Sequence, residues 1–400
     1  MSVKYFERSF VINAEIQGSQ QTIPTGDIRD SVPVLFIDSS IELEKVIREW
    51  SKLEWLAVDT EFERRTSFYA KLALVQIYDG QKIYLIDPFE VDCPRELKKV
   101  FESPDVIKIF HSSKEDLEVL YTAWDCRIQG LFDTQVANSF LTAEISLGYA
   151  KITEIVTGIF VDKQETTSDW VKRPLGEKQL DYAAKDVLYL PEIYQVLKRQ
   201  ITSKSYYPYF QAECEEFTQQ AIERIENFAD YRDAKDVWRL NGKDLSLFQV
   251  LFEWRELTAR ADDRTRNHII KEPELVQLAE VKPNSVEQIK QLLHLHPRSI
   301  RLYANKWISI IDKWQQVEQT ELIPVLNPRD VTGLKKVIDQ ISKIVDRVAD
   351  EQKIAKTLLF SKRLIRKLAF STATKSKMPT QWNGWRKNLL AKALKIEELI

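Results

Sequence analysis

The sequence predicts an α/β domain with a mixed sheet, followed by two all-α units. Three strand-like runs lie close together in residues 55–87, with a hairpin signal between the second and the third. Strand and helix patterns then alternate as far as residue 124, and helical patterns dominate from 134 to 200; this combination indicates an α/β domain with a mixed sheet. After residue 201 the apolar spacing is helical throughout, and only 10 of the 400 residues are glycine, as expected for a helix-rich chain.

The elements of the α/β domain follow from local signals. A helix is predicted to begin at Ser39 and Ser40, because this serine cap precedes apolar residues that recur on one helix face. Asp79 and Gly80 predict a hairpin, since both residue types favour a tight turn between strands. The predicted strands span residues 55–62, 72–78, 82–87 and 106–110, and the predicted helices span 39–50, 95–101 and 114–124, with further helices between 134 and 200.

The length of the chain predicts two to three domains, at about 150 residues for each domain. Short helices separated by prolines form one unit in the C-terminal half, and a further helical unit follows Asn327-Pro328. The predicted divisions are an extension of unknown role (1–32), the α/β domain (33–204), a helical linker (205–242), a first helical domain (243–318), a linker (319–329) and a second, basic helical domain (330–400).

Composition argues against several classes of protein. No apolar run approaches the roughly 18 residues of a membrane helix, and charged residues interrupt the first apolar stretch, unlike a signal peptide. Three cysteines without paired spacing argue against a disulfide framework or a cysteine-based zinc site, so we expect a reducing cytoplasm. With only four histidines, a bound metal must rely mainly on carboxylates, which favours magnesium or manganese.

Charge is distributed unevenly along the chain. Residues 330–400 contain 16 Lys or Arg against 7 Asp or Glu, a net charge of +9, whereas residues 1–329 carry 42 basic and 53 acidic residues. A basic end beside an acidic body is compatible with a nucleic-acid partner. The simpler interpretation is a single solvated helix face formed by Lys362, Arg363, Arg366 and Lys367.

Acidic residues occur in three patterns that suggest a shared site. Asp59 and Glu61 alternate on one face of the first strand, with Cα atoms about 6.5–7 Å apart, and such a pair repels unless cations neutralise it. Asp116 lies in the first turns of a helix that follows a later strand. Tyr182 and Asp186 are four residues apart and therefore share a helix face. Taken singly, the patterns have simpler explanations: a solvated strand end, a favourable helix N-terminus and a surface Tyr–Asp pair.

In this order, the three patterns resemble the DEDD exonuclease superfamily in its tyrosine-bearing subgroup, and in particular the ribonuclease D family. The resemblance runs from about residue 33 to the C-terminus, where the helical units resemble the HRDC domain of RecQ-type helicases and ribonuclease D and a second, diverged copy of it. It rests on residues 59–62, 72–80, His111 with 115–119, 132–135, 168–170 with 173–175, 181–187, 251–260, 269–278, Pro283 and 382–386.

The resemblance implies a ribonuclease H-like α/β exonuclease domain with a mixed sheet, followed by two all-α HRDC-like domains. It also implies hydrolysis of RNA from the 3′ end to nucleoside 5′-monophosphates with two divalent cations, Mg²⁺ or Mn²⁺. Asp59 would bridge both cations, Glu61 and Asp186 would complete the site of one, and Asp116 would hold the other. Tyr182 would orient the attacking water. We expect a monomer without membrane contact, whose RNA substrates are tRNA and other stable RNA precursors.

Further residues are weaker candidates. Phe62 would stack on the terminal base or belong to the core. His111 would contact the substrate near the site or form a supporting hydrogen bond. Trp170 and Arg173 lie beside a polar loop of residues 166–169 and would cover the terminal nucleotides and hold a phosphate. Alternatively, Trp170 would only pin that loop to the core. Gln76 is interpreted as a satisfied polar residue on a strand.

Two other functions are compatible with these residues. One is a DNA 3′–5′ exonuclease, because proofreading domains use the same carboxylates and nothing in the sequence displays recognition of the 2′-hydroxyl group. The other is a non-catalytic RNA-binding or helicase-binding module on a degenerate nuclease fold. The presence of all five predicted site residues argues against that second alternative.

Overall fold

The structure is a computed structural model that describes residues 32–142, 146–161, 168–292, 294–318, 321–382 and 384–394. The chain divides into a unit of residues 1–33 and a unit of residues 34–400, and the description below concerns the second unit. Nearly all of the predicted extension lies outside the described residues, as do Thr166 and Thr167 of the predicted polar loop and Asn383 near the C-terminus.

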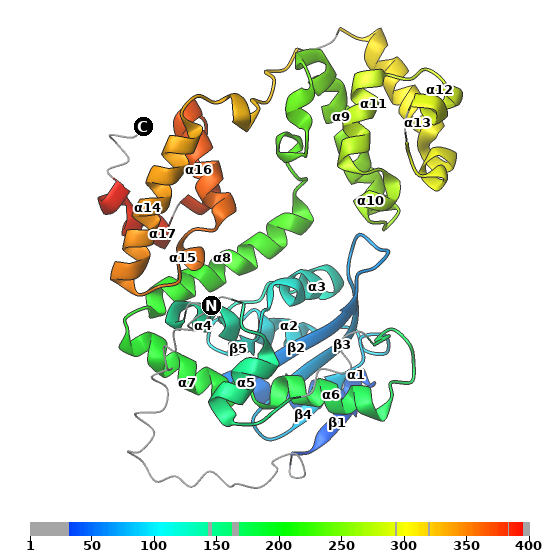
Figure 1. Ribbon diagram of the computed structural model, residues 1–400. Helices are drawn as coiled ribbons and strands as arrows, with labels where there is room; N and C mark the ends of the chain where they lie inside the picture. The colour runs from blue at the N-terminus through cyan, green and yellow to red at the C-terminus, as the bar shows by residue number, and fades with distance from the viewer. Residues whose placement is uncertain are drawn as a thin grey trace, which may run out of the picture. The chain divides into compact units, whose positions relative to one another are not determined.

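The described part of the α/β domain contains a mixed sheet of six strands in the order β1-β4-β3-β2-β5-β6 (Figure 1). Strand β3 pairs antiparallel with both β2 and β4, whereas the β1–β4, β2–β5 and β5–β6 pairs are parallel. The predicted mixed sheet is therefore confirmed. The strands are β1 (Val34–Ile37), β2 (Trp55–Glu63), β3 (Lys71–Tyr78), β4 (Ile83–Ile86), β5 (Ile107–Phe110) and β6 (Leu131–Asp133).

The hairpin between β3 and β4 forms at the predicted turn. Asp79 accepts the backbone N–H groups of Gln81 and Lys82 through Oδ1, and Gly80 has a φ of +92°, which favours glycine. The two edge strands, β1 and β6, are absent from the sequence prediction. They have only four and three residues, and three of the four in β1 are exposed, so neither carries an alternation that local patterns could detect.

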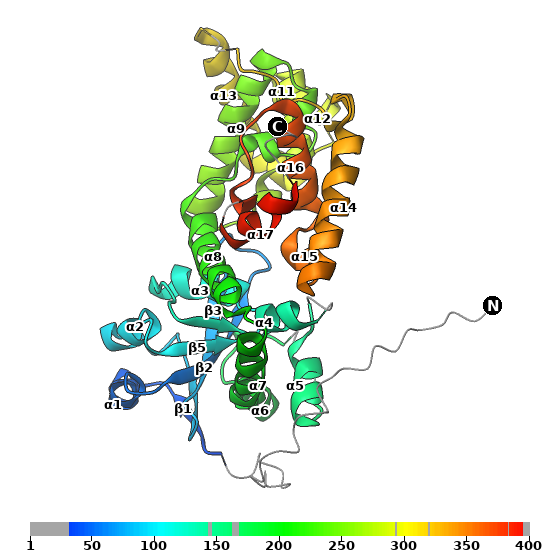
Figure 2. The same ribbon diagram turned by 90° about the vertical axis from the view of Figure 1, so that its left-hand side faces the viewer.

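Helices cover both faces of the sheet, and side-chain alternation along β2 decides what each face carries. Leu56 and Val58 pack in a core cluster with residues of the helices α1, α2 and α3. Asp59 and Glu61 project to the other face, where α6 packs against β2, β3 and β4. Figure 2 shows α1 and α2 on one side of the sheet and α6 and α7 on the other. The helices are α1 (Ser40–Trp50), α2 (Arg95–Phe101), α3 (Lys114–Trp124), α4 (Thr134–Leu141), α5 (Tyr149–Thr157), α6 (Glu177–Leu188) and α7 (Leu190–Ser203).

The remaining described chain is helical, as predicted. Helix α8 packs against α3 and β6, with Phe210 and Cys214 buried. A first helical core gathers around Leu251, Phe252 and Trp307, and α14, α16 and α17 pack together in the last unit. The bounds are α8 (Tyr207–Glu226), α9 (Gly242–Ala261), α10 (Arg266–Ile269), α11 (Glu272–Val281), α12 (Val286–Leu292), α13 (Pro297–Gln316), α14 (Leu334–Gln352), α15 (Lys356–Leu359), α16 (Lys362–Thr374) and α17 (Gly384–Leu394), with short 3₁₀ turns at 231–233, 237–239, 328–330 and 380–382.

A Trp-Arg pair occurs in each helical unit, but the two pairs lie in different surroundings. Trp254 is only partly buried, at the edge of the first helical core beside Trp307. Arg386 is buried and donates to Glu213 and Glu216 of α8 at 2.7 and 3.1 Å.

Within the described residues, no helix is long and apolar enough to span a membrane.

Candidate active site

Three of the predicted acidic residues form a compact group. One carboxylate oxygen each from Asp59, Glu61 and Asp186 lies within 4.8 Å of the others. The first two come from β2 and the third from α6, so helix packing on the sheet completes the group. Asp116 is buried and lies outside this three-residue group, where it accepts a hydrogen bond of 2.5 Å from the hydroxyl of Thr60.

Asp133 holds the turn that places Asp116. Its carboxylate is fully buried and accepts hydrogen bonds from the backbone of Ser112 and Ser113, which precede α3, and from the Ser113 hydroxyl, at 2.7–3.1 Å. It also accepts the N–H groups of Gln135 and Val136 at the start of α4. One carboxylate thus joins the N-terminal ends of two helices, and the φ of +62° at Ser112 is supported by these bonds.

The pKa values of all four carboxyl groups are raised above their ordinary values. Burial is the largest cause of raised pKa values for Asp59, Glu61, Asp116 and Asp186. It raises the pKa of Glu61 to about 9, with further contributions from the charges of Asp186 and Asp116. The pKa of Asp116 and that of Asp186 rise to about 7, although a hydrogen bond from Tyr182 lowers that of Asp186. The pKa of Asp59 is well above its usual range because burial is reinforced by the neighbouring charges.

These residues fit a divalent cation. Closely spaced carboxylates repel one another when they ionise. A bound cation would offset that repulsion and allow them to ionise. The donors are all oxygen atoms, which suit hard cations such as Mg²⁺ and Mn²⁺. Asp59, Glu61 and Asp186 are also partly exposed, so the group is accessible from solvent.

Tyrosine and histidine side chains lie around the group. The Tyr149 hydroxyl donates to the carbonyl of Lys185 at 2.6 Å, next to Asp186 in α6, and the pKa of Tyr149 is raised by burial and then by the Asp186 charge. The His111 ring lies 5.7 Å from that of Tyr149. Sequence reasoning missed Tyr149, since a tyrosine at the start of a helix gives no signal before the packing of α5 is known.

His111 has a supporting contact of the kind that the sequence suggested as one of its two roles. The Thr134 hydroxyl donates to the carbonyl of Phe110 at 3.0 Å, so its oxygen is left to accept. His111 Nδ1 lies 2.8 Å from that oxygen and therefore donates to it. This chain of bonds orients the imidazole at the end of β5, and a substrate contact by His111 stays a prediction.

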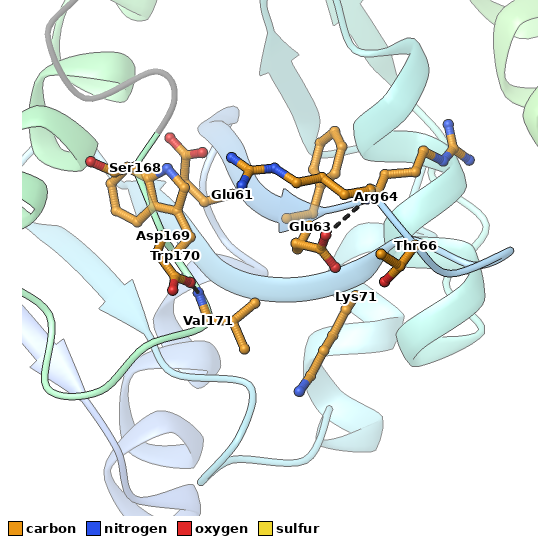
Figure 3. Close-up of a pocket in the computed structure, with 11 residues that line it drawn as sticks. Glu61, Glu63, Arg64, Thr66, Lys71, Ser168, Asp169, Trp170 and Val171 are labelled. Atoms are coloured by element: carbon orange, nitrogen blue, oxygen red, sulfur yellow. Dashed lines mark hydrogen bonds between the residues drawn. The ribbon is translucent and has the colours of Figure 1, made fainter. Parts of the chain in front are cut away.

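A pocket of about 590 Å³ opens beside Glu61 (Figure 3). Figure 3 shows Glu61 and Trp170 at one end of it and Lys71 away from them. Phe62 is partly buried and packs against the core, which is one of its two predicted positions. It also lines the pocket, and its stacking on a terminal base stays a prediction. Trp170 is almost fully buried, with its ring 6.1 Å from that of Tyr182. The lining contains both basic and acidic side chains, and Arg64 is paired with Glu115 and Glu118 at 3.3 and 2.5 Å. Arg65 and Lys71 are the other basic residues of the lining.

Two sequence interpretations change with the contacts. Arg173 donates to Asp87 at 2.5 and 2.8 Å and to the carbonyls of Ala73 and Trp170, so its guanidinium ties the loop to the sheet and would have to exchange partners to reach a substrate. The interpretation of Gln76 as a satisfied residue is wrong. Its side chain is fully buried, and neither amide atom has a hydrogen-bond partner among the described residues.

Three known families match successive parts of the chain. Residues 34–202 match the family described as 3′-5′ exonuclease, residues 244–311 match the HRDC domain, and residues 332–394 match the C-terminal HRDC domain of ribonuclease D. The matches follow the observed order of an α/β domain and two helical units.

Relatives of known identity cover most of the chain. Ribonuclease D of Escherichia coli strain K12 is 32% identical over 343 residues, or 85% of this chain and 91% of that protein. Ribonuclease D of Pseudomonas paraeruginosa is 32% identical over 366 residues, covering 90% and 96%.

Solved structures give the same result. The crystal structure of E. coli RNase D matches with a TM-score of 0.84 and 30% identity, over 91% of this chain and 97% of that one. The catalytic core of RRP6 from Trypanosoma brucei shares the fold alone, with a TM-score of 0.52 and 20% identity over 71% of this chain and 80% of that one. The chain therefore belongs to the ribonuclease D family and is a 3′–5′ exoribonuclease.

Proposed function

We propose that this enzyme trims RNA 3′ ends by two-metal-ion hydrolysis and releases nucleoside 5′-monophosphates. The observation that carries the proposal is the group of Asp59, Glu61 and Asp186, whose carboxyl groups resist ionisation without a cation. It borders a pocket with basic and aromatic side chains, which suit phosphates and unstacked bases. When bound, two divalent cations would activate water and stabilise the charge that develops on the phosphate.

Each site residue has a proposed role. Asp59 would contribute to both cation sites, Glu61 and Asp186 to the one that activates water, and Asp116 to the other. Tyr182 would orient the attacking water, because a phenol with a pKa near 10 is a poor base at neutral pH but a good hydrogen-bond partner. Phe62 and Trp170 would contact the terminal nucleotides from the pocket wall. Mg²⁺ or Mn²⁺ is the proposed metal.

The substrate is proposed to be structured RNA, in particular tRNA and other stable RNA precursors. The E. coli relative is described as an exoribonuclease involved in structured RNA processing, which supports this choice. A monomeric state, the predicted domain boundaries and the expected cytoplasmic location stay predictions.

End-labelled substrates test the proposal. Purified protein with Mn²⁺ or Mg²⁺ should shorten 5′-labelled RNA stepwise and release labelled mononucleotide at once from 3′-labelled RNA. A DNA oligonucleotide of the same sequence should be degraded more slowly. Faster hydrolysis of the DNA would favour the DNA exonuclease alternative, and RNA binding without hydrolysis in either metal would favour the non-catalytic module.

Replacing Tyr182 by Phe should lower kcat by about 10²-fold or more, the usual contribution of a positioned proton-transfer or hydrogen-bonding group. Metal affinity should change little, because the hydroxyl is not a proposed ligand. Stopped-flow hydrolysis and calorimetric Mn²⁺ titration would measure the two quantities. Tyr194→Phe is the matched control, since the Tyr194 hydroxyl pairs with Lys198 on α7 instead. A collapse of Mn²⁺ binding in Tyr182→Phe would contradict the assigned role.

The basic end of the chain is proposed to capture RNA. Lys362, Arg363 and Arg366 are exposed on α16. Each phosphate neutralised on a single strand contributes about 0.7 to the slope of log affinity against log salt. Replacing all three residues by Gln should therefore weaken RNA binding and reduce that slope by as much as about 2, with little effect on hydrolysis of a dinucleotide.

Filter binding at several salt concentrations measures this effect. The control replaces Lys45, Arg48 and Lys52 by Gln, which removes three exposed positive charges from α1 and the residues just after it. An unchanged salt slope in the α16 variant would identify that face as a solvated surface without a role in RNA binding.

A further inference from the structure

Gln76 is a buried amide whose position the fold leaves unexplained. Its side chain is fully buried in β3, and neither Nε2 nor Oε1 has a hydrogen-bond partner among the described residues. Buried side-chain amides are almost always paired, because the loss of contact with water destabilises the folded state unless a protein group replaces it. An unpaired amide at this position therefore indicates a role other than stability.

The sheet register places Gln76 beside the carboxylate group. Gln76 lies directly opposite Asp59 in the antiparallel β2–β3 ladder, so both side chains project to the same face. Directly opposed residues have Cβ atoms about 4.5–5.5 Å apart, which a glutamine amide can span. On its other side, Gln76 faces Leu85 of β4, and α6 covers all three strands. Among its direct cross-strand partners, only Asp59 is polar.

The chemistry of the two groups is complementary. A carboxylate that binds a cation is ionised and therefore only accepts hydrogen bonds, so Asp59 needs a donor beside it when the group of Asp59, Glu61 and Asp186 holds a cation. A glutamine amide supplies a donor without adding charge, and it leaves the charge of the group available to cations. A lysine or arginine at the same position would compete with the cations for the carboxylates.

We propose that Gln76 is a positioning residue for Asp59: its amide N–H group donates to the ionised carboxylate and holds it in the orientation that binds the cation. The proposal rests on the proposed metal-dependent function. Gln76 acts through Asp59 and does not touch the RNA. Partners that orient metal ligands typically change metal affinity or activity by about 10–100-fold when they are removed.

Replacing Gln76 by Met tests this role, because methionine keeps the length of the side chain and removes both polar atoms. The metal-free variant should melt at a higher temperature than the wild type, since an unpaired buried amide is gone. Its Kd for Mn²⁺, measured by calorimetry, should rise about tenfold, and kcat should fall by a similar factor. KM for RNA should stay unchanged. If the Met variant does not fold, Gln76→Leu serves the same purpose.

Leu85→Met is the matched control, because Leu85 is buried directly across the ladder from Gln76, one strand further from Asp59, and has no polar atom in its side chain. It should leave Mn²⁺ affinity and kcat unchanged. A Gln76→Met protein with a higher melting temperature but with Mn²⁺ affinity and kcat within twofold of the wild type would overturn the proposal. The two hypotheses fail differently, because a wild-type protein that bound no Mn²⁺ would refute the proposed metal-dependent function itself.

Discussion

Replacing Asp59 by Asn should abolish hydrolysis while leaving the protein folded. Asp59 is the member of the carboxylate group whose pKa responds to all three of the others, so it occupies the electrostatic centre of the site. Its loss would remove a ligand proposed for both cations. Metal ions contribute several kcal/mol to phosphoryl transfer, so we expect kcat to fall by roughly a thousandfold or more.

The same substitution should stabilise the metal-free protein at alkaline pH. Asn has nearly the shape of Asp but needs no proton to stay neutral, so the repulsion with Glu61, Asp116 and Asp186 disappears. Urea unfolding at pH 8.5 in EDTA would show a higher free energy of unfolding than the wild type. Asp181→Asn is the control, because Asp181 is an exposed residue of α6 that pairs with Lys185. Near-normal turnover of Asp59→Asn in Mg²⁺ would contradict the two-metal assignment.

Without metal, the protein should become less stable as the pH rises from about 5 to 9. The pKa values of Glu61, Asp116 and Asp186 are raised to about 9, 7 and 7, above their values in the unfolded chain. The folded state therefore binds more protons, and its stability is full at low pH and declines as these groups ionise. The three side chains differ in exposure, and after discounting for solvent screening we expect a loss on the order of 1–3 kcal/mol.

Metal should reverse this trend, because cations bind the ionised carboxylates and displace their protons. Mn²⁺ should therefore raise the melting temperature more at pH 8.5 than at pH 5.5. Calorimetric titration at pH 6 in buffers of different ionisation enthalpy should detect proton release, with less release at pH 9. Glu61→Gln should flatten the pH dependence of the metal-free protein, and a stability that rises between pH 5 and 9 in EDTA would contradict the pKa directions.

Local patterns were sufficient to predict most elements of the α/β domain. Strand alternation predicted β2 and β3 and the shared face of Asp59 and Glu61, because side chains point to opposite faces at every step of a strand. The i, i+4 rule likewise placed Tyr182 and Asp186 together on α6. The motif order and its family resemblance were equally local, since they depend only on residue types and their spacing.

Contacts between distant segments decided the rest. The edge strands β1 and β6 form because they pair with the neighbouring strands β4 and β5. A run of three or four residues is too short for its own sequence to predict such pairing. Helix packing brought Asp186 to β2, and left Asp116 beside Thr60 outside the three-residue group. The anchoring of Arg386 on α8 is likewise absent from any local pattern.

Burial and hydrogen bonding at the site also depended on tertiary structure. Asp133 looks like an ordinary helix cap in the sequence, yet its carboxylate joins the starts of α3 and α4. Gln76 looks like a satisfied polar residue, yet its amide is enclosed without a partner opposite Asp59. The sequence by itself determined which chemical groups this enzyme has and in what order. Only the tertiary structure decided which of them meet, because pairing and removal from water arise between residues that are far apart in the chain.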